Sequence, residues 1–177
     1  MRTLRYGSWP SPIAPADLAA SGVRLSPGLV DGGIGYWTEG RPSDGGRVSL
    51  WRRLPGADPA EVAPDAYVRS AVNEYGGGAW TARDGLVAYC SWPDGAVHLV
   101  EDGLDRVLAA ADELRYAGLS LVPARRLMLA VREDHRASEA EPEQTVVALE
   151  LDAANSDGRR VLAAGADFYA HPGLSAD

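Results

Sequence analysis

The sequence predicts an all-β protein built from repeated four-stranded units. From residue 32 onward, short stretches rich in β-branched and aromatic residues alternate with Gly, Pro and Asp-Gly turn signals. Similar segments recur at intervals of roughly 40 to 55 residues, a period typical of repeat architectures. The first 30 residues differ, because four prolines interrupt them. We therefore divide the chain into an N-terminal arm, residues 1–30, and a repetitive β region, residues 31–177.

The arm is expected to be mostly irregular and to pack against another part of the protein. Residues 15–21 can form one short helix, with Pro15 near its start and Gly22 as its C-terminal stop. Trp9 lies in the irregular part and is a candidate contact with a separate domain.

The strands of the β region are predicted from their short length and their flanking turn residues. In chain order they are 34–39, 47–52, 79–82, 86–91, 96–101, 118–122, 126–132, 145–151 and 161–164. Segment 42–46 closes the first hairpin, and Asp84-Gly85 and Asp94-Gly95 give tight reversals in the next unit. A fresh unit is expected to begin at Phe168.

Two segments complicate this assignment. Residues 106–115 can be interpreted as a helix, although they stand where the second unit needs a last strand and a crossover. Residues 138–144 are acidic and polar, and we expect a solvated loop there.

The repeat predicts the architecture. Residues 114–120 match residues 167–175 with a small insertion, and residues 31–37 resemble residues 83–89. Four short strands in each period are typical of β-propeller blades, which bury both faces only between two neighbours. We count about three blades plus the start of another, whereas a closed ring takes typically 4 to 8. The sequence therefore predicts an incomplete β-propeller, the N-terminal piece of a longer protein, whose open faces favour self-association.

The composition narrows the possible functions. The formal net charge of −8 disfavours nucleic-acid binding, which needs a basic surface. No apolar run is long enough for a membrane span, and the first residues lack a signal-type apolar segment, so we expect a cytoplasmic location. The single cysteine, Cys90, lies in an apolar run and is expected to be a small buried residue. The three histidines are far apart, so no metal or cofactor is expected.

Six stretches together carry a family resemblance. In chain order they are residues 6–13, 36–42, 73–80, 114–117, 131–136 and 165–169. The most distinctive is Asn73-Glu74-Tyr75-Gly76-Gly77-Gly78-Ala79-Trp80. In this order they resemble the N-terminal propeller of bacterial prolyl-oligopeptidase-family serine peptidases, of the acylaminoacyl-peptidase or dipeptidyl-aminopeptidase type.

The resemblance implies a two-domain parent enzyme. A propeller would cover a C-terminal α/β-hydrolase domain and limit entry to short peptides. That second domain would carry a serine on a Gly-x-Ser-x-Gly elbow, followed by an aspartate and a histidine. This sequence contains no such elbow; Ser120 follows Gly118 at the right spacing, but Val122 stands where the second glycine belongs. The chain alone should therefore not hydrolyse peptides, and no residue in it is assigned a catalytic role.

Glu74 and Tyr75 are the first candidates for a binding role. One interpretation is structural, since the three glycines after them allow positive φ or close packing at the start of a strand. In the other, Glu74 points into a cavity and pairs with a substrate's amino terminus or with an arginine of the hydrolase domain. The family stretch commonly begins with histidine, and Asn73 stands there, which puts any pH-linked role of that position in doubt.

A second group of candidates follows a predicted strand: Arg132, Glu133 and His135, with Asp134 and Arg136 beside them. These residues can form a solvated turn with local ion pairs of little energetic weight. Alternatively, they form a charged rim that faces the hydrolase domain or the substrate channel. The strand aromatics Tyr36, Trp37, Trp51 and Trp80 are expected to pack between blades.

The sequence thus predicts the non-catalytic, gating portion of a serine peptidase that cleaves short peptides. Its expected partners are the C-terminal hydrolase domain and, in the parent enzyme, the peptides. The alternative is a stand-alone propeller that binds or scaffolds other molecules without a linked enzyme. The sequence beyond Asp177 distinguishes the two, because only the first predicts further blades followed by a nucleophile elbow.

Overall fold

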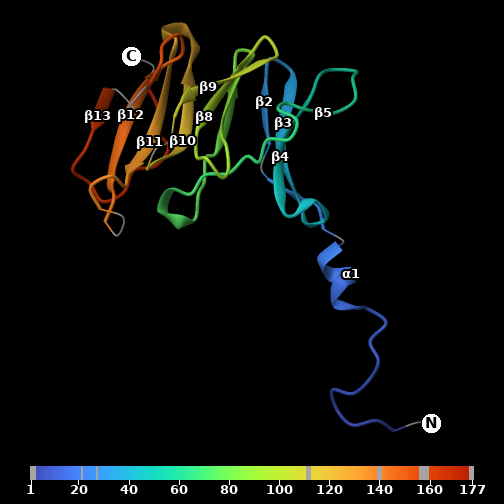
Figure 1. The fold of residues 1–177 in the computed structure, drawn as a ribbon. Coiled ribbons are helices and arrows are strands. Elements are labelled where there is room, and N and C mark those ends of the chain that lie inside the picture. The colour runs from blue at the N-terminus through green and yellow to red at the C-terminus, as the bar shows by residue number, and fades with distance from the viewer. Residues whose placement is uncertain are drawn as a thin grey trace.

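Three antiparallel sheets stand side by side in chain order (Figure 1). The computed structural model describes residues 3–20, 22–26, 28–110, 113–138, 141–155 and 160–175. The sheets formed by these residues make an open arc and do not close into a ring (Figure 1). The predicted all-β, partial-propeller fold is confirmed. Within the described ranges, no helix combines the length and apolar character needed to cross a membrane.

The first sheet fills four strand positions with five strands. They are β1 (Arg24–Leu25), β2 (Leu29–Asp31), β3 (Ile34–Arg41), β4 (Arg47–Arg53) and β5 (Ala60–Glu61). Both β1 and β2 pair with β3, so they share one position on its edge. These two short strands lie in or next to the segment expected to be irregular. The predicted hairpin is present, and its turn is a 3-10 helix, η1 (Pro42–Asp44), that ends at Gly45 with φ 60°.

The second and third sheets have four strands each. The second contains β6 (Trp80–Arg83), β7 (Leu86–Cys90), β8 (Val97–Glu101) and β9 (Leu104–Ala109). The third contains β10 (Leu114–Val122), β11 (Leu127–Asp134), β12 (Glu143–Glu150) and β13 (Arg160–Ala163). The two sheets have the orders β6-β7-β8-β9 and β10-β11-β12-β13.

The helix considered for residues 106–115 does not form in the described part of that segment. Asp102 and Gly103 both have positive φ, which gives the tight reversal that starts β9 antiparallel to β8. The next sheet already begins at Leu114. The expected solvated loop at 138–144 is also shorter than predicted, because β12 begins at Glu143 and Gln144 is buried.

The apolar core lies between the sheets. Tyr36 and Leu50 of the first sheet pack with Val87 and Tyr89 of the second. The opposite face of the second sheet packs against the third through a larger cluster, which includes Ala88, Leu99, Tyr116, Met128 and Leu149. Every residue of the middle strand β7 is buried, whereas every residue of β13 is exposed. The second sheet is thus a complete blade with a neighbour on each side.

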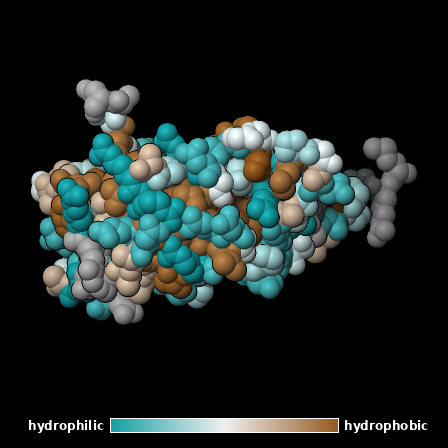
Figure 2. Space-filling model, turned by 90° about the horizontal axis from the view of Figure 1, so that it is seen from above, coloured by the Kyte–Doolittle hydropathy of each residue, from teal (hydrophilic) through white to brown (hydrophobic). Residues whose placement is uncertain are grey.

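The first part of the arm, residues 3–20, extends away from the sheets, whereas its last residues form β1 and most of β2 (Figure 1). Its helix α1 (Pro15–Ala20) confirms the predicted helix as far as Ala20, and Ser21 lies outside the described residues. Residues 3–20 expose four large apolar side chains, those of Tyr6, Trp9, Ile13 and Leu18. It leaves the sheets at the end where η1 and the loop between β11 and β12 also lie, the lower end in Figure 1. The opposite end, seen in Figure 2, intermixes hydrophilic and hydrophobic residues.

Residues 164–175, where a fresh unit was expected, contain no strand within the described range. The segment turns back onto the third sheet instead. Tyr169 packs against Val72, Ala117 and Val131. The segment therefore covers part of the face of the third sheet that points away from the second.

Candidate functional site

Two adjoining cavities lie beside the second and third sheets, at the end where β10 and β12 begin and β11 finishes. The first has a volume of about 410 Å³, and its lining includes Arg69, Glu74, Trp92, Glu113, Arg115 and His135. The second has a volume of about 790 Å³, and its lining includes Asn73, Glu74, Glu133, His135, Gln144 and Phe168. Glu74 and His135 line both, so the candidate site is centred on these two residues.

The backbone around Glu74 is unusual. A 3-10 turn, η2 (Val72–Glu74), holds Asn73 and Glu74 in the left-handed region, with φ of 54° and 61°. Glycines are needed directly afterwards: a Cβ on Gly76 would lie 2.4 Å from the carbonyl oxygen of Ser70, and one on Gly78 would lie 2.7 Å from the backbone nitrogen of Gly118. The structural interpretation of the glycine run is therefore supported at Gly76 and Gly78.

Glu74 is exposed and already ion-paired. Its Oε1 lies 2.5 Å from Nη1 of Arg115, and its side chain is 79% exposed. The same Arg115 Nη1 donates to the carbonyl oxygen of Ala71 at 3.1 Å. The hydrogen bond and charge of Arg115 lower the pKa of Glu74 below its ordinary value. Glu74 is therefore a carboxylate at neutral pH that an incoming cation can approach from the solvent side.

Glu133 and His135 lie behind Glu74. The Glu133 side chain is 3% exposed, and the His135 side chain is 9% exposed. Nε2 of His135 lies 3.3 Å from Oε2 of Glu133. Because a carboxylate only accepts hydrogen bonds, this contact places a proton on Nε2. Within the described part of the chain, Nδ1 of His135 is buried without a partner.

The other two predicted residues are not part of this cluster. Tyr75 is 95% exposed and is not among the residues that line the cavities. Arg132 is buried at 6% exposure, and its Nη2 lies 3.8 Å from Asp134 Oδ2. Of the five candidates, the structure brings together Glu74, Glu133 and His135.

Sequence reasoning missed two polar residues of the site. Arg115 lies in β10 of the third sheet, and its place in the family-like stretch 114–117 was the available signal. Gln144 was assigned to a solvated loop, yet its Nε2 donates to Asn73 Oδ1 at 2.6 Å and to Glu133 Oε1 at 3.1 Å. Its buried position follows from β12 starting at Glu143, two residues before the predicted start at residue 145, which no local pattern indicated.

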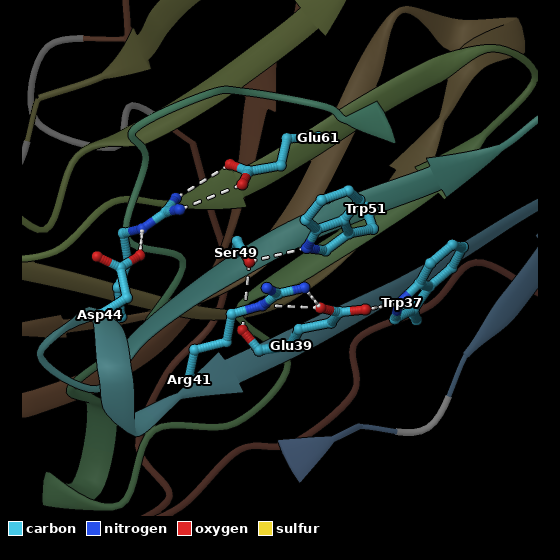
Figure 3. Close-up of polar contacts among 8 residues, drawn as sticks. Trp37, Glu39, Arg41, Asp44, Ser49, Trp51 and Glu61 are labelled. Atoms are coloured by element: carbon cyan, nitrogen blue, oxygen red, sulfur yellow. Dashed lines mark hydrogen bonds and ion pairs between the residues drawn. The ribbon is translucent and has the colours of Figure 1, made fainter. Parts of the chain in front are cut away.

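A separate polar cluster lies on the first sheet (Figure 3). The indole N–H of Trp37 donates to Glu39 at 3.0 Å, and that of Trp51 donates to Ser49 at 2.8 Å. The two indoles stack with their centroids 6.5 Å apart, and the guanidinium of Arg41 lies over Trp51. These residues satisfy one another within one sheet and line neither cavity, which indicates a structural role.

The predicted packing of aromatics between blades holds for part of the set. Tyr36 and Trp80 contribute to the core between the first and second sheets. Trp37 lies on the opposite face from Tyr36, because neighbouring strand residues point to opposite sides. Trp37 pairs with Trp51 across the strands. On that face the described chain supplies no further sheet.

Comparison with known proteins gives similarity to solved structures. No protein-family model matches the chain. None of the curated proteins matches it significantly. A puromycin-hydrolysing peptidase of Mycobacterium tuberculosis is 33% identical, with a TM-score of 0.79, over 98% of this chain and 29% of that one. A puromycin hydrolase is 26% identical, with a TM-score of 0.76, over 91% of this chain and 27% of that one.

A more distant likeness supports the fold alone. An acylaminoacyl peptidase of Pyrococcus horikoshii is 10% identical, with a TM-score of 0.56. The match covers 82% of this chain and 25% of that one. In all three comparisons the chain spans less than a third of the length of the protein that it matches.

Proposed function

Since the chain is homologous to the propeller region of prolyl-oligopeptidase-family peptidases, we propose that it is the non-catalytic part that controls access to a peptidase active site. The active site would lie in an α/β-hydrolase domain outside these 177 residues. The observation that carries the proposal is the match to a puromycin-hydrolysing peptidase over 98% of this chain and only 29% of that protein. Short peptides, or small aminoacyl amides such as puromycin, are the substrates that the neighbours suggest, and the expected cytoplasmic location belongs to the same proposal.

The hydrolase domain would dock at the end that carries the candidate site. Both cavities are lined by Glu74 of η2, and the second also by residues of the loop between β11 and β12. The arm leaves the sheets at the end where this loop lies (Figure 1). Large exposed apolar side chains such as Trp9 and Leu18 are favourable contacts for a second domain. The charged residues that line the cavities, such as Glu74, would then face the substrate channel.

In this proposal the hydrolase domain carries out the peptide-bond chemistry, and this chain contributes to substrate access and binding. Serine, histidine and aspartate of the hydrolase domain would form and break the acyl-enzyme. Glu74 would supply a carboxylate at the propeller side, either to the ammonium group of the substrate or to an arginine of the hydrolase domain. The propeller would cover the active site and keep out folded proteins, which are too large to enter.

The test begins with the coding DNA past Asp177 and the full-length product. A fluorophosphonate probe should label one serine downstream of a Gly-x-Ser-x-Gly elbow and should leave the 177-residue chain unlabelled. A stop codon directly after Asp177, or a full-length product that no probe labels, would contradict the proposal and favour a stand-alone binding propeller.

Kinetics on the full-length enzyme separate the two roles of Glu74. If Glu74 binds the substrate amine, Glu74→Gln should raise KM for peptides with a free amino terminus and leave N-acetylated peptides unchanged. If it pairs with the hydrolase domain, both substrate sets should be affected equally. Glu150→Gln is the matched control, because Glu150 is an exposed carboxylate at the end of β12 and lines neither cavity.

A further inference from the structure

Glu133 is a buried carboxylate that holds the turn on which Glu74 sits. It accepts the backbone N–H of Asn73 at 2.7 Å and Nε2 of Gln144 at 3.1 Å, both on Oε1. Its other oxygen faces Nε2 of His135 at 3.3 Å. A carboxylate that is only 3% exposed needs such donors, because burying an unpaired charge is very unfavourable. It is too deeply buried to form a charged rim.

The turn needs outside support. Two consecutive non-glycine residues, Asn73 and Glu74, have positive φ, a conformation that side chains with a Cβ disfavour. Glu133 fixes the N–H of the first of them, and Gln144 binds its side-chain oxygen. Both supporting residues come from the third sheet, 60 and 71 positions further along the chain. Local sequence therefore does not determine this turn.

We propose that Glu133 is a positioning residue, which fixes the Asn73–Glu74 turn and so places the Glu74 carboxylate beside Arg115 at the mouth of the cavities. Gln144 completes the support and extends it. Its Oε1 accepts the backbone N–H of Tyr169 at 2.9 Å, so one buried cluster joins the connection before the second sheet to the segment after the third. What Glu74 then does rests on the proposed function, whereas the positioning does not.

The experiment uses the 177-residue chain and two readouts at the turn. Hydrogen exchange of the Asn73 amide should be about tenfold to a hundredfold faster in Glu133→Ala, since a hydrogen bond to a charged acceptor is lost. The pKa of Glu74, followed by NMR of its carboxyl carbon, should rise toward its ordinary value as the Arg115 contact loosens. The groups that face Glu74 and enter this titration are Arg115 and His135.

Two further variants keep the test decisive. Glu133→Gln retains an acceptor for the Asn73 N–H, so it should restore much of the lost protection even if Glu133→Ala does not fold. Glu150→Ala removes an exposed carboxylate from the far end of the adjacent strand, outside both cavities, and should change neither readout. A folded Glu133→Ala chain with unchanged Asn73 exchange and unchanged Glu74 pKa would overturn the proposal. A full-length enzyme without probe labelling would instead overturn the proposed function and leave the positioning intact.

Discussion

Gly118 marks the point where successive units meet at their inner strands. Gly78, just before the second sheet, accepts the N–H of Leu119 at 3.2 Å. A Cβ added to Gly118 would contact Pro172 at 3.3 Å and the backbone nitrogen of His171 at 3.5 Å. The third sheet thus meets the glycine region before the second sheet, and the C-terminal segment meets Gly118, through close backbone approaches.

The close approach makes Gly78 sensitive to substitution. In Gly78→Ala, the new methyl group would lie 2.7 Å from two backbone atoms of Gly118, at a φ of 54°. We expect a loss of about 2–4 kcal/mol in the free energy of unfolding, from overpacking and the left-handed backbone together. Denaturant unfolding measures it. Gly45→Ala is the control, because Gly45 has a similar φ of 60° and open space around it, so a comparable loss there would remove the steric explanation.

Asp134 gives a pH-dependent contribution to stability. Hydrogen bonds from Arg136, at 2.9 Å to Oδ1 and 2.5 Å to Oδ2, lower the pKa of Asp134 to about 2. A carboxyl with a depressed pKa in the folded state stabilises above its unfolded pKa, and the contribution disappears as the pH falls toward 2.

Removal of the guanidinium tests this linkage. Arg136→Ala should lower the free energy of unfolding by on the order of 1 kcal/mol at pH 7, a small value because Arg136 is partly exposed. The difference from the unmodified chain should shrink as the pH approaches 2. Urea unfolding at both pH values decides it, and Arg125→Ala at an exposed turn is the control. A difference that is constant with pH would show that Asp134 does not titrate as stated.

At the scale of elements, regular alternation was predictable and short inner strands were not. Strands β3, β4 and β7 carry β-branched or aromatic residues between clear turn signals, and each was predicted within about two residues of its bounds. β1 and β2 have two and three residues, and their only support is pairing with β3. Such strands form only because they pair with β3, and two or three residues are too few to show a recognisable strand pattern.

The start of β10 was missed for a related reason. Leu114–Ala117 pairs with Arg132, Val131 and their neighbours, but Gly118 at φ 59° interrupts the register before Ser120. From sequence alone, the glycine at this bulge indicates the start of the strand, which is therefore predicted from residue 118. Arg115, which pairs with Glu74 in the candidate site, lies in the part that precedes the bulge.

Arg47 fastens the short outer strand of the first sheet. Its guanidinium donates to both oxygens of Glu61, at 3.0 and 3.2 Å, and to Asp44 at 2.6 Å (Figure 3). A further bond reaches the carbonyl oxygen of Ala66 at 3.2 Å. One side chain therefore ties η1, β4, β5 and the following loop together.

Substitution of Arg47 should loosen this edge. We expect Arg47→Ala to cost about 1–3 kcal/mol in the free energy of unfolding, because several charge-assisted hydrogen bonds are lost at a half-buried position. Hydrogen exchange of Val62, whose N–H donates to Leu50, should accelerate as well. Arg47→Lys should recover little, since an ammonium cannot replace the paired geometry. Arg53→Ala, at the exposed end of β4, should have a much smaller effect.

At the scale of the whole molecule, the fold was predictable while the assembly of the site was only partly so. Glu74 and His135 were candidates because their own segments were distinctive. Their convergence depends on Asn73 meeting Glu133 and Gln144 across 60 and 71 residues, which only the arrangement of three sheets creates. The same arrangement buries Glu133, so a residue that local sequence placed at a charged rim supports the turn from within.

The first sheet differs from the middle one in having one face that no other sheet covers within the described residues, and this difference has a consequence in solution. The second sheet buries both faces, whereas Trp37 and Trp51 of the first sheet face away from it. Apolar area that no neighbouring sheet covers drives association. We expect the 177-residue chain to self-associate with rising concentration, as sedimentation velocity can measure.

Trp51→Glu should weaken that association, because it places a charge on the open face. Trp9→Ser serves as the comparison: it removes an exposed indole from the arm, so an equal effect there would assign the association to the arm instead. Circular dichroism checks that both variants keep their strands. A chain that stays monomeric at all concentrations and unfolds in one sharp transition would contradict the expectation, since it would mean that three blades bury enough surface to be stable without a fourth.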